Sequence, residues 1–98
     1  RDQMANEGII TVVVPVDLAG ERIAGEPVIT VAGLLMRLED ALRDEMMVAL
    51  RESIESMLER GTSDPARLEK RVASIAASYI YRGHRRRPKI QPIILDVS

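Results

Sequence analysis

The feature that most constrains this chain is a continuous apolar run near its start, IITVVVPV, which spans Ile9 to Val16. Successive side chains of a β-strand point to opposite faces of the sheet. Both alternating sets are mainly apolar in this run, whereas a strand with one wet face carries polar residues at every second position. The run therefore predicts a buried strand.

Two further runs of β-forming residues complete the expected sheet. Turn residues follow Val16, and a second run from Ile23 to Val31 lies at hairpin distance. Gly25 and Pro27 weaken its centre, which favours an edge or bulged strand. The last run, Ile90 to Val97, contains Pro92, so we expect that this strand lacks a hydrogen-bonding neighbour there or begins at Ile93.

Between these runs the apolar residues recur every three or four positions, which predicts two amphipathic helices. The first is expected to start near Val31 or near Arg37 and to end at Gly61, a C-terminal glycine cap. Asp64 and Pro65 supply an N-cap and a proline at the first position of the second helix. Gly83 is expected to end it. The core positions of the second helix are Leu68, Val72, Ile75, Ala76, Tyr79 and Ile80.

The order of elements is thus β-β-α-α-β, an α+β class. The simplest architecture is a two-layer sandwich, with a three-stranded sheet and two helices on one face. A length of 98 residues allows one core, so residues 1–98 are interpreted as a single domain. Because the sequence begins with Arg1, we expect a fragment or a processed product of a longer protein.

Two helices on one face leave the other face of the sheet without a cover. If Ile10, Val12, Val14 and Val16 meet the helices, the outward side chains are Ile9, Thr11 and Val13, joined by Ile94 or Ile93 depending on register. The expected association face is Ile9, Thr11, Val13 and Ile94. An apolar face of this kind favours binding of a partner, although isolated apolar residues are also common on ordinary protein surfaces.

The composition excludes most catalytic chemistry. There is no cysteine and only one histidine, so thiolate chemistry and an ordinary zinc site are missing. The paired acids of the first helix alternate with arginine, as on a solvated helix face, and no phosphate-binding glycine motif is present. No catalytic, cofactor-binding or metal-binding residue is therefore predicted. No run is long enough to span a membrane, and a cytoplasmic location is expected.

A basic cluster just after the second helix is the one polar feature with some specificity, and it consists of Arg82, His84, Arg85, Arg86, Arg87 and Lys89. Cations at this place complement the helix dipole, and arginine forks also suit phosphate or an acidic partner surface. Both interpretations stay open. The formal net charge is -1, and the chain has two Tyr and no Phe or Trp, so contact with RNA would have to be local.

Two stretches, RDQMANEGIITVVVPVD near the start and RRRPKIQPIILDV near the end, resemble the C-terminal domain of bacterial ribonuclease J. The family typically shows R-D, six residues and G-V before a strand rich in Val and Ile, and closes with R-R-R-P-x-I-x-P-x-I-x-x-V. The resemblance covers essentially the whole chain. Family members often carry Ser-Arg-Gly-aromatic after the second strand, whereas this chain has Thr30 to Leu34, TVAGL.

The resemblance implies a parent enzyme of the metallo-β-lactamase and β-CASP type, a 5′-3′ exoribonuclease and endoribonuclease with two zinc ions. None of its His/Asp metal motif lies in this chain, so the fragment is expected to be inert alone and to hold no cofactor. The implied role is support of dimerisation and enzyme assembly, with a second copy or the catalytic body as partner. The alternative is an RNA-contact module through Arg82 to Lys89.

Overall fold

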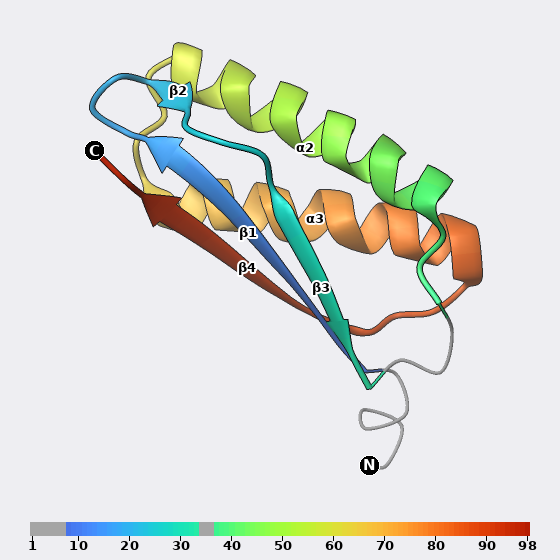
Figure 1. Ribbon diagram of the computed structural model, residues 1–98. Coiled ribbons are helices and arrows are strands. Elements are labelled where there is room, and N and C mark those ends of the chain that lie inside the picture. Colours follow the sequence, from blue (N-terminus) through green and yellow to red (C-terminus); the bar gives the residue numbers. More distant parts are fainter. Residues whose placement is uncertain (1–7, 34–36) are drawn as a thin grey trace.

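The computed structural model describes residues 8–33 and 37–98, and it has the expected α+β architecture (Figure 1). A mixed sheet forms one layer, and two long helices form the other. The elements, in chain order, are β1 (Ile9–Asp17), β2 (Arg22–Ile23), β3 (Val28–Ala32), α2 (Asp40–Glu59), α3 (Pro65–His84) and β4 (Lys89–Asp96).

The sheet is three strands wide, as predicted, with β1 in the middle. On one side β1 pairs in parallel with β4, from Ile9 opposite Lys89 to Val16 opposite Asp96. On the other side it pairs antiparallel with both β3 and β2. The second predicted strand is thus split into two short strands, which makes a fourth strand. The break coincides with Gly25 and Pro27, where the sequence predicted a weak centre.

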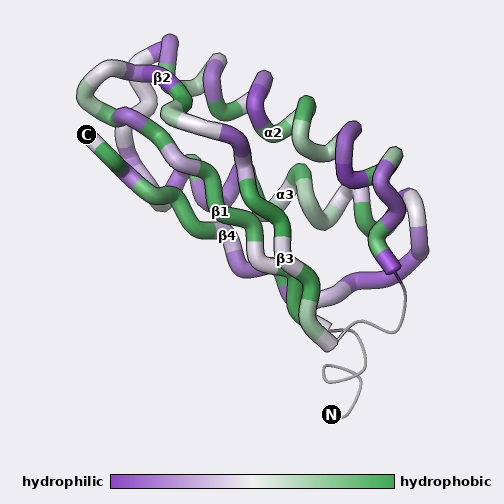
Figure 2. The backbone as a smooth tube through the Cα atoms, viewed as in Figure 1, coloured by the Kyte–Doolittle hydropathy of each residue, from purple (hydrophilic) through white to green (hydrophobic). Residues whose placement is uncertain are grey.

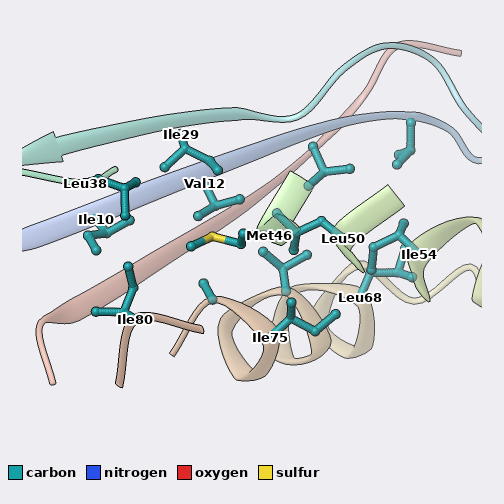
Figure 3. Close-up of a cluster of buried hydrophobic side chains, with 14 of the residues drawn as sticks. Ile10, Val12, Ile29, Leu38, Met46, Leu50, Ile54, Leu68, Ile75 and Ile80 are labelled. Atoms are coloured by element: carbon teal, nitrogen blue, oxygen red, sulfur yellow. The ribbon is translucent and has the colours of Figure 1, made fainter. Parts of the chain in front are cut away.

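Both helices cover the same face of the sheet, and the core lies between the two layers (Figure 3). Every second side chain of β1 is fully buried there, namely Ile10, Val12, Val14 and Val16. Helix α2 contributes Met46, Leu50, Ile54 and Leu58, while α3 contributes Leu68, Val72, Ile75, Ala76 and Ile80. Burial of each such side chain favours folding by about 1.5–3 kcal/mol before the entropic cost is counted. The aliphatic core therefore fixes which face of β1 is outward.

The connection between the helices follows the local signals in the sequence. The amide of Gly61 donates to the carbonyl of Leu58 at 2.9 Å, and the amide of Thr62 donates to that of Met57 at 2.9 Å. These bonds form a Schellman motif, for which the positive φ of Gly61, 90°, is well suited. Asp64 then accepts a hydrogen bond from the amide of Ala66 at 3.1 Å and caps α3.

Two predicted helix ends are wrong. Helix α2 begins at Asp40, later than either predicted start, because Glu39 has an extended backbone (φ -69°, ψ 146°). Part of the uncertain stretch, residues 34–36, lies outside the described residues. Helix α3 continues through Gly83 and ends at His84, and its C-cap Arg85 takes the left-handed conformation. Gly83 instead allows close packing, since a Cβ there would lie 2.9 Å from the Cδ2 of Leu42.

Pro92 lies inside β4, so the alternative start at Ile93 is wrong. The amides of Lys89 and Val97 donate to carbonyl oxygens of the β1 side, at Gly8 (3.1 Å) and Val16 (2.8 Å). Backbone groups alternate between the two edges of a strand, which places the nitrogen of Pro92 on the outer edge. The missing donor of proline therefore costs no bond to β1.

Candidate interaction surfaces

The face of the sheet away from the helices is uncovered in the described part of the chain. In Figure 2 the three main strands are coloured mainly as hydrophobic. The register aligns Val28, Val13 and Ile93 in one row across β3, β1 and β4. Pro15 and Leu95 form the next row, followed by Val97. We call this set the apolar patch: Val13, Pro15, Val28, Ile93, Leu95 and Val97.

Several members of the apolar patch are substantially exposed. The exposed fractions are 53% for Val28, 37% for Ile93, 50% for Leu95 and 55% for Val97. The rows of Val13 and Pro15 carry no charged side chain, whereas Val97 lies beside Asp17, which pairs with Arg22. Contiguous apolar surface on a small domain is typical of a binding site.

The opposite end of the same face is polar. Thr30 and Thr11 share a row with Gln91, and the hydroxyl of Thr11 donates to the amide oxygen of Gln91 at 3.4 Å. Ile9, which is 43% exposed, stands in the last row beside Lys89. The open face is therefore graded from a polar end to an apolar end.

The structure places three of the four predicted association residues on this face: Ile9, Thr11 and Val13. Ile94 lies on the other side, because it pairs with the fully buried Val14 and packs against the core. Ile93 takes the outward position. The physical reason is the parallel register of β4 with β1, which sets the orientation of every β4 side chain and is not encoded in β4 alone.

The basic cluster is ordered by tyrosine rings. The guanidinium of Arg82 lies over Tyr79, 4.3 Å from the ring centre. Arg87 and Arg85 lie over Tyr81 at 4.2 Å and 5.3 Å. Cation–π contacts of this kind hold arginine side chains in defined positions. Arg85 and Arg87 are thereby brought together at Tyr81, whereas Arg82 lies at Tyr79, two positions earlier and therefore on the opposite side of α3.

Tyr81 is half-buried, and the pKa of its phenol lies below the usual value of 10.0. The hydrogen bond from Arg85 is the largest cause, followed by the hydrogen bond from Arg87 and its positive charge. Both cations favour the phenolate. Tyr81 is therefore a partner of the arginines through its hydroxyl as well as its ring.

The remaining predicted residues of the cluster differ in exposure. Lys89 is exposed at the start of β4, while Arg86 is half-buried. His84 is half-buried, and its Nε2 atom is shielded from solvent without a hydrogen-bond partner in the described part of the chain. The structure therefore separates His84 from the exposed cations of the cluster.

A groove between the solvent sides of α2 and α3 was not predicted. It encloses about 770 Å³ and is lined by hydroxyl, basic and apolar side chains, with Glu52 the one acid. We call it the serine groove; its polar residues are Ser53, Ser56, Ser74, Ser78, Arg60, Arg71, Glu52 and Tyr79. The serines recur at three- and four-residue spacing beside the apolar stripes, and this spacing was the available signal.

The described residues offer no metal site. Across residues 8–33 and 37–98, no group of three or more His, Asp or Glu side chains is placed to hold a metal ion. The donor set therefore does not fit the zinc ions that the family resemblance implied for the parent enzyme. In the same ranges, neither helix is long and apolar enough to cross a membrane.

A comparison with known protein families identifies the family of this chain. The family model described as the ribonuclease J C-terminal domain matches residues 1–97. Since the match covers nearly the whole sequence, the chain belongs to the ribonuclease J C-terminal domain family. The resemblance drawn from the two ends of the sequence is confirmed.

Proposed function

We propose that this ribonuclease J C-terminal domain is a non-catalytic assembly module of an RNA-degrading enzyme, and that it associates through the apolar patch to form a homodimer. The observation that carries the proposal is the uncovered row of Val28, Val13 and Ile93, extended by Leu95. Burying this surface removes apolar area from water and favours association.

A second copy of the chain is the simplest partner. The rows of Val13 and Pro15 carry no charge, and Asp17 beside Val97 is neutralised by Arg22, so two copies facing each other bring no unpaired like charges together. Flat sheet faces of this kind pack on one another in β-sandwiches at a spacing of about 10 Å. A two-fold axis through the patch would let each residue serve both copies.

The size of the face predicts a weak dimer for the 98-residue chain. Three strands about 4.8 Å apart and about 30 Å long give a footprint of roughly 400 Å². Stable interfaces bury about 800 Å² on each partner. In the proposal, the rest of the interface in the parent enzyme therefore comes from outside this surface.

Analytical ultracentrifugation of the chain over a series of concentrations tests the proposal. We expect reversible self-association at high concentration, and loss of it in Val13→Lys. A chain that stays monomeric up to millimolar concentration would contradict the homodimer. If deletion of the domain also left the oligomeric state of the parent enzyme unchanged, the assembly role would be contradicted as well.

A second candidate function is contact with RNA through the basic cluster. Arg82 and Arg87 lie against tyrosine rings, which reduces the ordering cost of binding a phosphate. Replacing Arg85, Arg86 and Arg87 together with alanine should weaken RNA binding and lower its salt dependence. Unchanged binding by this triple variant would reject the candidate.

In this proposal, the zinc-dependent chemistry implied for the parent enzyme belongs to another part of that protein. The single histidine of this chain, His84, has its Nε2 atom shielded from solvent. No hydrolytic step is therefore assigned to this domain.

A further inference from the structure

The charges of this nearly neutral chain are strongly segregated along the sequence. Residues 65–89 carry eight Lys or Arg side chains against one acid, a net charge of +7. The rest of the chain carries a net charge of -8, and α2 alone has six acidic residues and two arginines. The helix layer therefore has an acidic helix beside a basic one.

The basic side chains around the serine groove do not pair with these acids. The ion pairs found in the described residues join Arg22 to Asp17 and Arg51 to Glu26, both away from the groove. Arg60 and Arg71 line the groove, and a neighbouring hollow is bordered by Arg67, Lys70 and Arg71. No carboxylate within ion-pair distance neutralises these four cations in the ranges that the structure describes.

Serine hydroxyls hold two of the arginines in place. The Nε of Arg71 donates to the hydroxyl of Ser53 at 2.8 Å, a bond that crosses from α3 to α2. Arg60 donates through one terminal nitrogen to Ser56. Each guanidinium has further N–H groups, which are able to bind an anion in a forked geometry.

The groove and the neighbouring hollow are together long enough for a few nucleotides. Their lining on α3 runs from Arg67 to Tyr79, twelve residues apart, which corresponds to about 18 Å along the helix. The exposed hydroxyls of Ser74 and Ser78 lie between them on the groove side. Tyr79 lines the far end, and Arg82 lies over its ring.

We propose that the serine groove between α2 and α3 binds the phosphodiester backbone of single-stranded RNA. Arg60, Arg71 and their basic neighbours contact phosphates, and the serine hydroxyls donate hydrogen bonds to phosphate oxygens. The groove has no stacking platform beyond one tyrosine, so binding is independent of base sequence. The identity of the polyanion as RNA rests on the proposed function, whereas the groove itself rests on geometry and charge.

Fluorescence anisotropy with a labelled oligouridylate and the 98-residue chain tests this inference. The double variant Arg60→Gln/Arg71→Gln removes two phosphate contacts, each contributing about 0.7 to the slope of log affinity against log salt. At 0.1 M salt we expect a loss of affinity of about 25-fold and a slope reduced by about 1.4. The matched control Arg22→Gln/Arg51→Gln removes the same charge away from the groove and should change little.

Two single variants with opposite expected effects on RNA affinity, Ser78→Asp and Glu52→Gln, separate changes in binding from changes in folding. Ser78→Asp places a negative charge in the groove and should weaken binding, while Ala77→Asp places it on the same helix outside the lining. Glu52→Gln removes the one acid of the lining and should strengthen binding several-fold. A variant that gains affinity is not explained by unfolding.

Equal losses in the groove and control double variants would overturn the inference, because binding would then follow net charge alone. Competition by inorganic phosphate as strong as by the oligonucleotide would also overturn it, since the site would then be one for isolated phosphate. Failure of the proposed dimerisation is read separately by sedimentation without RNA. Loss of binding in the triple alanine variant of the basic cluster, with none in Arg60→Gln/Arg71→Gln, would place RNA at the cluster instead.

Discussion

Replacing Leu95 with lysine perturbs the apolar patch where it is most accessible, and the structure sets the size of the expected effect. Half of the side chain's surface is exposed in the isolated chain. Full burial of a leucine is worth about 1.5–3 kcal/mol, so the half that a partner covers contributes about 1 kcal/mol. In a symmetric dimer the contact occurs twice, which gives about 2 kcal/mol, or roughly a 30-fold change in Kd.

The lysine should leave the fold itself intact, because Leu95 is exposed in the sheet edge strand β4. A matched control is Val48→Lys on α2, where the valine is 54% exposed on the opposite layer. Both variants add one positive charge to an exposed apolar position. Circular dichroism melts should therefore be similar for the two.

The assay is sedimentation equilibrium of the two variants and the wild type over the same concentration series. We expect Leu95→Lys to raise the dimer Kd at least 30-fold by the estimate above, while Val48→Lys stays near the wild-type value. If only Val48→Lys shifts Kd, association takes place through the helix layer, and if both variants shift Kd equally, the added charge alone weakens association. The assignment of the sheet face would then be wrong.

Two further predictions concern ionisable groups. Asp96 has a pKa below 3.8, owing to hydrogen bonds from the hydroxyl and amide of Ser98 and the amide of Leu18. The resulting stabilisation is present above the pKa of Asp96 in the unfolded state and is lost as pH falls through the pKa in the folded state. The Tm difference between wild type and Asp96→Asn should therefore shrink below about pH 4. A Tm difference that does not depend on pH would contradict this. Arg85→Gln should raise the pKa of Tyr81 toward 10.0, measured by absorbance of the phenolate; an unchanged titration would show that Arg85 does not stabilise it.

The parts of the fold that sequence predicted well are those set by neighbouring residues. Asp64 caps α3 and Gly61 ends the preceding helix turn, because both positions depend only on local hydrogen bonds and backbone conformation. Gly83, in contrast, was wrongly predicted to end α3. Its role is to accommodate Leu42, forty-one positions earlier, and no local signal distinguishes a packing glycine from a capping one.

The orientation of the last strand shows the same limit. Ile93 and Ile94 are equally apolar neighbours, and only pairing with β1 decides which of them faces out. The sequence did restrict the register through Pro92, because its nitrogen has no hydrogen to donate and must face the edge of β4 that has no neighbouring strand. Register between strands that are eighty residues apart is a property of the tertiary structure, so the outward orientation of Ile9, Thr11 and Val13 was predicted correctly and that of Ile94 was not.

The serine groove was missed for a related reason. Its two walls lie on different helices, and the bond from Arg71 to Ser53 exists only once they pack. The net charge of -1 also argued against a polyanion site, because a sum over the chain hides the opposite charges of α2 and the segment after Asp64. Electrostatic attraction depends on local charge within about a Debye length, roughly 8–10 Å, rather than on the total.

The apolar patch and the serine groove lie on opposite layers of the domain, and this separation has a thermodynamic consequence. A dimer formed through the sheet faces leaves both helix layers outward, so RNA binding and self-association use different surfaces. We therefore expect RNA to leave the dimer Kd unchanged, and by linkage dimerisation then leaves the RNA affinity unchanged as well. Sedimentation with and without a saturating oligouridylate measures this coupling. A clear shift in Kd would mean that the two surfaces are coupled or that RNA bridges two copies, and the separate assignment of patch and groove would have to be abandoned.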